Sequence, residues 1–207
     1  GVDPAQRKRQ RLAEVLQREA ELAEDPGRAV AYLQRRAELL EEHLGDPDRA
    51  RAAWDDVRAA APSQLPALRA LGRLHARAGR WEELAAMYRA EADAAADPAA
   101  AADLLHRIGE LLERRMGRVD DAGGAYRETL TLAPAHLPAL HALARIYRAR
   151  GDDDHLVEVL RAQGAARLAP VERAAPLAEA ARIAEERLGD PARAIEHYEE
   201  VLRIAPG

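Results

Sequence analysis

The stretch from Gly189 to Pro206, GDPARAIEHYEEVLRIAP, decides the fold because the chain contains the same pattern two more times. The earlier copies are GDPDRARAAWDDVRAAAP, which starts at Gly45, and GRVDDAGGAYRETLTLAP, which starts at Gly117. The interval between successive glycines is 72 residues in both cases. Self-similarity at a fixed period predicts a protein built from repeated structural units rather than around one globular core.

A shorter period of 36 residues lies inside the longer one. It is marked by prolines, namely Pro26, Pro62, Pro98, Pro134, Pro170 and Pro206. Because proline stops a helix, a helix is expected to end at each of these points. A glycine divides each unit into two helical segments, since glycine accepts the positive φ that often follows a helix. These glycines are Gly45, Gly79, Gly117, Gly151 and Gly189.

Each 36-residue unit is therefore predicted to be a helical hairpin. We expect an all-α, right-handed α-solenoid of stacked antiparallel helix pairs with about 11 helices. The single array 1–207 divides into a half hairpin, 1–26, and the hairpins 27–62, 63–98, 99–134, 135–170 and 171–206. Helices are expected near 5–24, 27–44, 47–60, 64–78, 80–95, 99–116, 119–132, 136–150, 152–167, 171–188 and 191–204. One hairpin leaves its apolar stripe in water, so stability must come from stacking.

The composition narrows the class of function. The chain has 207 residues, a formal net charge of −5 and no cysteine. This charge gives no support for nucleic-acid binding, which needs a net basic face. No apolar run approaches the roughly 20 residues that span a bilayer, so no membrane partner is expected. The lack of cysteine excludes thiolate chemistry, and a reducing cytoplasm is the expected location. Lys8 is the only lysine among 31 basic residues, a bias that we interpret as the codon signature of a bacterial genome.

No constellation of residues suits catalysis, a cofactor or a metal ion. The seven histidines are scattered, and none forms the helical pair with an intervening Glu that a zinc peptidase needs. His75 stands at a position equivalent to Tyr147, where a packing role is expected. The acidic run that starts at Asp152 is interpreted as a helix N-terminus. We therefore expect no enzyme activity, no catalytic residues, no cofactor and no metal site.

Two spacings recur within the hairpins. Residues 63–98 contain Leu68-x2-Leu71-Gly72-x2-His75, then Leu84-x3-Tyr88 and Pro98. The other hairpin type has Ala50-x3-Trp54, Ala122-x3-Tyr126 and Ala194-x3-Tyr198 in its second helix. This pattern resembles the tetratricopeptide repeat, which implies a scaffold that binds proteins or peptides. The unit is longer than the usual repeat of about 34 residues, so pentatricopeptide and other helical-hairpin solenoids stay open as alternatives.

The resemblance implies a groove lined by the first helices, where similar arrays bind extended peptides or partner helices. The groove positions that transfer to this chain are Arg69, Arg73, Arg77, His141, Arg145, Arg148, Glu38 and Glu110. Their arginines could hold an acidic peptide, since a guanidinium binds a carboxylate with two hydrogen bonds. The alternative is that Arg73 and Arg145 pair with Glu38, Glu110 or Glu185 on adjacent helices. A chaperone-tail clamp is not expected, because it needs Lys and Asn side chains.

The predicted function is a non-catalytic protein–protein interaction scaffold. It would bind a peptide or partner helix in the groove or through its ends, where ordinary arrays carry a polar capping helix. We expect the chain either to be a fragment of a longer protein or to self-associate through its terminal repeats, with Leu202 and Ile204 partly exposed in a monomer. Two alternatives remain, namely a regulatory repeat segment of a larger enzyme and a self-assembling architectural module.

Overall fold

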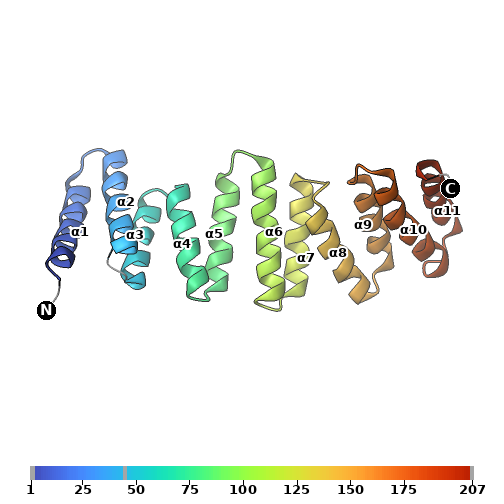
Figure 1. The fold of residues 1–207 in the computed structure, drawn as a ribbon, viewed down its shortest axis with the longest axis horizontal. Coiled ribbons are helices and arrows are strands. Elements are labelled where there is room, and N and C mark those ends of the chain that lie inside the picture. Colours follow the sequence, from blue (N-terminus) through green and yellow to red (C-terminus); the bar gives the residue numbers. More distant parts are fainter. Residues whose placement is uncertain (1–2, 44–45, 206–207) are drawn as a thin grey trace. The chain divides into compact units, whose positions relative to one another are not determined.

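The computed structural model describes residues 3–43 and 46–205. Eleven helices follow one another in these residues, joined by short connections (Figure 1). Their bounds are α1 Pro4–Leu22, α2 Pro26–His43, α3 Pro47–Ala60, α4 Leu65–Arg77, α5 Trp81–Ala94, α6 Pro98–Arg114, α7 Val119–Leu132, α8 Leu137–Arg150, α9 Asp153–Ala165, α10 Pro170–Glu186 and α11 Pro191–Ile204. The described residues contain no strand, and the predicted all-α class is confirmed.

The helix boundaries agree closely with those predicted. The ranges 47–60, 119–132 and 191–204 match α3, α7 and α11 at both ends. Every other predicted boundary lies within two residues of the structure. Gly45 and Pro206, which were expected to end helices, lie outside the described residues.

Three of the marker prolines begin helices instead of ending them. Pro26, Pro98 and Pro170 are the first residues of α2, α6 and α10. The first turn of a helix suits proline, because its N–H would have no partner there and its φ is already helical. The prediction that a helix stops at these three positions was therefore wrong. Pro62 and Pro134 do follow the ends of α3 and α7.

Local signals at both helix ends explain why the boundaries are sharp. The side chain of Asp46 accepts a hydrogen bond from the Arg49 amide at 3.0 Å, and Asp190 accepts one from the Arg193 amide at 3.0 Å. Asp152 caps α9 in the same way, as predicted for the acidic run. The predicted positive φ is found at Gly79, Gly117, Gly151 and Gly189, with values between 64° and 68°.

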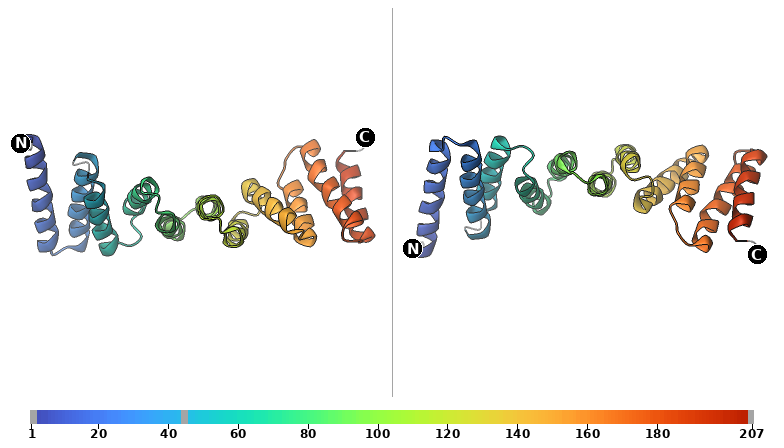
Figure 2. Two further views of the ribbon diagram at one scale, coloured as in Figure 1. Left: turned by 90° about the horizontal axis from the view of Figure 1, so that it is seen from below. Right: turned by 90° about the horizontal axis from the view of Figure 1, so that it is seen from above.

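The helices fall into two compact units, Gly1–Ala94 and Ala95–Gly207. Within each unit, successive helices pack side by side and alternate in direction (Figures 1 and 2). The first unit buries a cluster that includes Leu40, Trp54, Val57, Leu68 and Leu71. The second buries a cluster that includes Tyr126, Leu140, Leu143, Leu156 and Leu160. Stacked antiparallel helix pairs are thus confirmed within the units, and the grouping of 1–207 into a single array stays a prediction.

Candidate interaction surface

An acid and an aromatic residue form a hydrogen-bonded pair in the first unit. Trp54 of α3 is 3% exposed, and its Nε1 donates to Oε2 of Glu41 in α2 at 2.8 Å. Arg73 of α4 donates to both oxygens of the same carboxylate, at 3.1 and 3.3 Å. Both bonds come from the same nitrogen, Nη2, and hydrogen bonds between charged groups are stronger than those between neutral ones. The three side chains therefore tie the α2–α3 hairpin to the first helix of the next hairpin.

The second unit repeats this arrangement 72 residues later. The hydroxyl of Tyr126 in α7 donates to Oε2 of Glu113 in α6 at 3.0 Å, and Arg145 of α8 donates to both carboxylate oxygens of Glu113. Hydrogen bonding by Arg145 holds the pKa of Glu113 below its ordinary value. Burial raises the pKa of Tyr126, and the neighbouring carboxylate raises it further. Near neutral pH the acid is thus ionised and the phenol protonated, as these bonds require.

A third acid–aromatic pair lies between α10 and α11. The hydroxyl of Tyr198 donates to Oε2 of Glu185 at 3.3 Å. Partial burial and the negative charge of Glu185 raise the pKa of Tyr198. In the described part of the chain, however, no arginine forms an ion pair with Glu185. Tyr198 is 37% exposed, against 3% for Trp54 and 1% for Tyr126, because the helix that covers the other two aromatics has no counterpart among the described residues.

The helix α11 carries an exposed apolar face around this tyrosine. Ile195, Tyr198 and Leu202 are spaced i, i+3 and i+7, and their exposed fractions are 56%, 37% and 65%. Val201 beside them is half-buried, whereas its equivalent Val57 in α3 is completely buried. We call Ile195, Tyr198, Val201 and Leu202 the α11 face.

The first helix has an exposed apolar face as well. Leu12 and Val15 of α1 are 47% and 53% exposed, although the residue equivalent to Leu12 in α5, Leu84, is only 3% exposed. At the other end, the predicted exposure of Leu202 is confirmed, and Ile204 is half-buried. Leu12 at one end and Tyr198 and Val201 at the other are thus more exposed than their buried internal equivalents Leu84, Trp54 and Val57.

The acids that bind Arg73 and Arg145 differ from those predicted. Glu38, Glu110 and Glu185 were expected as partners, but Arg73 binds Glu41 and Arg145 binds Glu113 instead. Glu38 and Glu110 make their contacts within their own helices. The acids that bind the arginines, Glu41 and Glu113, lie almost one turn after Glu38 and Glu110 on the same helices.

Two further arginines from the predicted groove positions also have partners inside their own unit. Nε of Arg69 lies 2.6 Å from Oε1 of Glu91 in α5, and Nη2 of Arg148 lies 2.7 Å from Oε1 of Glu179 in α10. His141 contacts an arginine of the α9–α10 loop at 3.1 Å, and burial lowers the pKa of its imidazole. Most of the basic side chains proposed for the groove thus already bind groups of the chain itself.

Arg77 differs from the other arginines of α4. It is exposed, and the residues that the structure describes supply no ion-pair partner for it. It lines a cavity of about 400 Å³ between α2, α3 and α4, together with Ala50 and Leu74. The carboxylates of Glu41 and Asp46 belong to residues that line the same cavity. The cavity therefore combines an apolar wall with charges of both signs.

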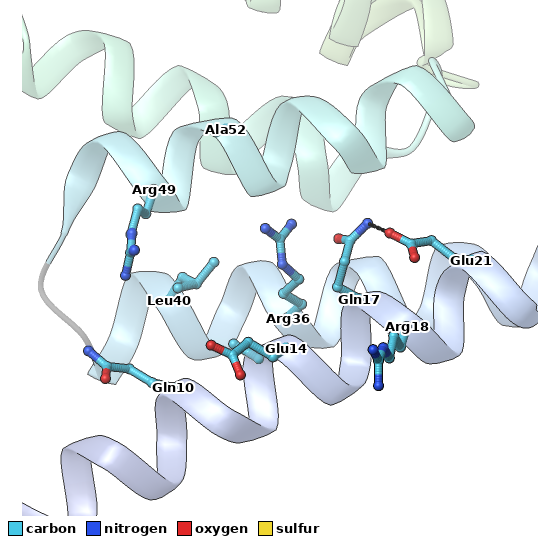
Figure 3. Close-up of a pocket in the computed structure, with 10 residues that line it drawn as sticks. Gln10, Glu14, Gln17, Arg18, Glu21, Arg36, Leu40, Arg49 and Ala52 are labelled. Atoms are coloured by element: carbon cyan, nitrogen blue, oxygen red, sulfur yellow. Dashed lines mark hydrogen bonds between the residues drawn. The ribbon is translucent and has the colours of Figure 1, made fainter.

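A larger cavity of about 490 Å³ lies between α1, α2 and α3 (Figure 3). Gln10 and Glu14 of α1, Arg36 of α2 and Arg49 of α3 line it. Nη1 of Arg36 binds Oδ2 of Asp56 at 2.9 Å. The cavity is open, and its lining combines these polar side chains with apolar ones such as Ala13 and Leu40.

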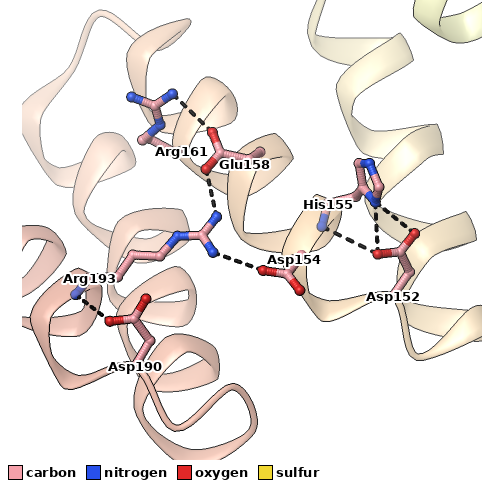
Figure 4. A network of polar contacts seen from close by, with 7 residues as sticks. All are labelled: Asp152, Asp154, His155, Glu158, Arg161, Asp190 and Arg193. Atoms are coloured by element: carbon pink, nitrogen blue, oxygen red, sulfur yellow. Dashed lines mark hydrogen bonds and ion pairs between the residues drawn. The ribbon is translucent and has the colours of Figure 1, made fainter.

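An ion-pair network lies at the corresponding place in the second unit (Figure 4). Arg193 of α11 binds Oδ1 of Asp154 at 3.0 Å and Oε1 of Glu158 at 2.6 Å, both in α9. These three residues are equivalent to Arg49, Gln10 and Glu14 of the open cavity. Because Gln10 is neutral where Asp154 is charged, the first unit has less electrostatic attraction to draw its arginine across the groove.

Other classes of site find no support in the described residues. None of the described helices combines the length and the apolar character that crossing a bilayer requires. No group of three or more acidic or histidine side chains in this part of the chain is placed to hold a metal ion. His75 is 6% exposed and packs at the position predicted from its equivalence with Tyr147, which is 5% exposed.

Comparison with known families matches the tetratricopeptide repeat at three places. One model of this repeat matches residues 67–101 and 139–170, and a second model of the repeat matches residues 177–207. Comparison with curated proteins gave no significant match.

Several solved structures are similar to the chain at low sequence identity. YrrB, described as a TPR protein with an unusual peptide-binding site, is 16% identical over 84% of this chain and 86% of its own, with a TM-score of 0.46. MamA is 16% identical over 87% of this chain and 93% of its own, with a TM-score of 0.48. TTC0263, a thermophilic TPR protein of Thermus thermophilus, is 18% identical over 86% and 92%, with a TM-score of 0.36. The family matches fall on the helix pairs α4–α5, α8–α9 and α10–α11, and these three helix pairs match the tetratricopeptide repeat.

Proposed function

We propose that the chain is a non-catalytic protein-interaction scaffold that binds a helix of a partner protein on the α11 face. The observation that carries this proposal is the exposure of Tyr198, whose equivalents Trp54 and Tyr126 are covered by α4 and α8. Apolar side chains that gather on one exposed helix face mark a surface for a partner. Tetratricopeptide-repeat arrays are in general interaction scaffolds, so this role agrees with the family.

The proposed occupant is an amphipathic helix of the kind that α4 and α8 provide inside the chain. The leucines Leu140 and Leu143 of α8 belong to the same buried cluster as Tyr126. α4 supplies the two equivalent leucines to the cluster around Trp54. Because α11 repeats the positions of α3 and α7, a helix with leucines at this spacing fits its face. Docking of one helix on another by such spaced apolar anchors is a common mode of recognition.

The proposed setting is the cytoplasm of a bacterium. This part of the proposal is supported by composition alone, namely the bias toward arginine and the lack of cysteine.

A binding experiment tests the proposed role of the α11 face. A fluorescent peptide with the sequence of residues 135–151, which spans α8, is titrated with the 207-residue chain and its anisotropy is recorded. We expect saturable binding, and we expect Leu202→Asp to weaken it by about tenfold or more, because a charge replaces an apolar anchor. The matched control is Leu168→Asp in the α9–α10 loop, where the leucine is 98% exposed. This control should leave binding unchanged.

Two results would overturn the proposal. The first is that the unaltered chain does not bind the peptide. The second is that sedimentation shows the chain associating with itself, with the association abolished by Leu202→Asp and the peptide unable to compete. That outcome would assign the α11 face to a second copy of the chain instead of a partner helix.

A second candidate function is the binding of an acidic peptide beside α4, with Arg77 as its anchor. The supporting observation is the cavity of about 400 Å³ next to this arginine, which has no ion-pair partner among the described residues. Arg69 and Arg73 are less available, since each already binds a glutamate of its own unit. A peptide carboxylate could bind the Arg77 guanidinium through two hydrogen bonds.

Titration with an acidic and a basic peptide of equal length, at low salt, tests this second candidate. We expect the acidic peptide to bind more tightly, and Arg77→Ala to remove most of the difference. Arg58→Ala is the matched control, because its guanidinium pairs within its own helix. Equal and negligible binding of both peptides would eliminate an acidic partner.

A further inference from the structure

The two complete acid–aromatic–arginine contacts share one sequence register. In each, the aromatic residue follows the acid by 13 positions and the arginine follows it by 32. The acids are well covered, with side-chain exposures of 15% for Glu41 and 12% for Glu113. The same chemistry therefore joins two successive hairpins in both units.

The Glu185–Tyr198 pair is the same contact without its arginine. The spacing of 13 residues and the hydrogen bond from the aromatic donor to the acid are both retained. Glu185 is exposed, unlike the two acids of the complete contacts, and no guanidinium in the described part of the chain lies in its ion-pair range. The pair thus leaves unused the carboxylate lone pairs that bind arginine in the other two copies.

We infer that the partner helix carries an arginine, which binds the Glu185 carboxylate beside Tyr198 as Arg73 binds Glu41 and as Arg145 binds Glu113. This inference rests on the proposed function and specifies the chemistry of the partner. The contact would fix the position of the partner helix along α11, because a bidentate arginine–carboxylate pair constrains both the distance between the two groups and the plane in which they lie.

The internal copies also define the sequence around this arginine. α4 has Leu68-x2-Leu71-Gly72-Arg73-Leu74, and α8 has Leu140-x2-Leu143-Ala144-Arg145-Ile146. The shared pattern is two leucines three residues apart, then a small residue, the arginine and an aliphatic residue. In both helices the small residue and the leucines are buried and the arginine is exposed. The partner helix is therefore expected to contain Leu-x2-Leu-small-Arg-aliphatic.

The charges around Glu185 favour an incoming arginine, and none of them already binds the Glu185 carboxylate. Glu186 follows on the same helix and adds a second negative charge, while Arg182 lies one turn earlier and opposes it. Neither Glu186 nor Arg182 makes a hydrogen bond to the acid–aromatic pair. An incoming arginine thus meets a net acidic site that already has an ordered hydrogen-bond donor on one side.

A double-mutant cycle tests the inference. The peptide of residues 135–151 and its Arg145→Ala form are titrated against the chain and against its Glu185→Gln form. We expect each single change to weaken binding by about fivefold, and the double change to weaken it hardly further, because both remove the same ion pair. Arg145→Lys in the peptide should lose part of the affinity, since an ammonium cannot make the bidentate contact.

Matched controls separate this contact from general charge effects. Arg148→Ala removes the same charge from the peptide three residues later, and Glu196→Gln removes the same charge from α11 on another side of the helix. Both should leave binding nearly unchanged. Exchange of the charges, with Glu185→Arg in the chain and Arg145→Glu in the peptide, should restore part of the affinity that each reversal alone removes.

A second measurement does not depend on the helicity of a short peptide. The sequence of residues 135–170 is appended after Pro206, and the thermal unfolding of the extended chain is compared with arginine or alanine at the copied position of Arg145. We expect the arginine form to unfold at the higher temperature, and we expect Glu185→Gln to abolish the difference.

The outcomes distinguish the inference from the proposed function. If the peptide binds through the α11 face but Arg145→Ala and Arg148→Ala have equal effects, the arginine contact is wrong and the scaffold role stands. Equal unfolding temperatures for the two extended chains would also overturn the contact. If neither the peptide nor the appended hairpin engages α11, the proposed function fails and the inference fails with it.

Discussion

Gly109 lies flat against the ring of Tyr126, so closely that a Cβ atom at position 109 would be 2.4 Å from Cε1 of the tyrosine. Tyr126 is 1% exposed and is held by its hydrogen bond to Glu113, so its ring has little room to move. We expect Gly109→Ala to lower the free energy of unfolding by about 1–3 kcal/mol, despite the better helix propensity of alanine. Urea denaturation followed by circular dichroism measures this change.

Gly124 provides the matched control for this prediction. It also lies inside a helix, α7, but a Cβ atom there would meet nothing within 4 Å. Gly124→Ala should therefore raise the free energy of unfolding by up to about 1 kcal/mol through helix propensity alone. Equal effects of the two substitutions would show that the contact with Tyr126 imposes no steric limit.

Removal of the acid from a complete contact should be costly. Glu113→Ala leaves the buried hydroxyl of Tyr126 without its acceptor, and we expect a loss of about 1–3 kcal/mol in the free energy of unfolding. Glu110→Ala, one turn earlier on α6, removes an acid that pairs with Arg114 of its own helix and should cost about 0–0.5 kcal/mol. Both variants are compared by chemical denaturation at neutral pH. Similar losses would contradict a special role for Glu113.

Acidification below neutral pH should weaken the fold through buried histidines. Burial lowers the pKa of His75, His106 and His197 in the folded chain below the ordinary value of 6.5. The unfolded chain then binds more protons than the folded one, so the free energy of unfolding should fall as the pH decreases from about 6.5 toward the folded-state pKa values. Denaturation curves at pH 7.5 and pH 5.5 measure this fall.

His75→Tyr tests the histidine origin of the effect. Tyrosine occupies the equivalent position in α8, as Tyr147, so the new side chain has a precedent in the same packing environment. The variant should reduce the pH dependence of the first unit between pH 7.5 and pH 5.5. A stability that does not change between pH 7.5 and pH 5.5 would refute the histidine prediction.

Glu113 contributes to stability in a lower pH range than the histidines. Its pKa is depressed from 4.5, so its contribution is present above that value and is lost as the pH falls through the folded-state pKa.

Arg193 should stabilise the second unit by joining α11 to α9. Its side chain is 23% exposed and binds both Asp154 and Glu158. We expect Arg193→Ala to lower the free energy of unfolding by about 1 kcal/mol at low salt and by less at high salt. Arg203→Ala is the control, because that side chain is 76% exposed. A salt-independent loss would point to packing of the arginine stem instead of charge.

Much of the fold could be predicted because its signals are local and repeated. The helix ends follow from Asp-Pro steps such as Asp46–Pro47 and from glycines such as Gly151, whose φ is 68°. The error at Pro26 and Pro98 arose because proline suits both the residue after a helix and its first turn. The aspartate before each of them was the distinguishing signal, since it accepts a hydrogen bond from an amide of the first turn.

The contacts of the candidate surface were harder to predict, because they depend on the exact direction of each side chain. Groove positions transferred from the family favoured the acid one turn too early on α2 and α6. The sequence did hold a better signal: an acid recurs 13 residues before the aromatic in all three copies, as Glu41, Glu113 and Glu185. At the position of Glu38 and Glu110 the third copy has Arg182 instead. Periodicity across every copy therefore identifies the structural acids.

The difference between the cavity at α1–α3 and the ion-pair network at α9–α11 was not predicted. Several lining positions differ between the two places, with Gln10 equivalent to Asp154 and Arg36 equivalent to Ala180, and only Arg193 reaches across to two acids of the facing helix. Spacing alone cannot decide between two orientations of a long side chain, since each is a staggered rotamer of similar energy.

The alternation between hairpins that supply an acid and hairpins that supply an arginine limits how such a gene can grow or shrink. Insertion or loss of 72 residues keeps the acid-supplying and arginine-supplying hairpins in alternation, as in the contacts of Glu41 with Arg73 and of Glu113 with Arg145. A change of 36 residues would set two hairpins of one kind next to each other and leave a charge without its counterpart. Recombination that preserves folding is therefore expected to move two hairpins at a time.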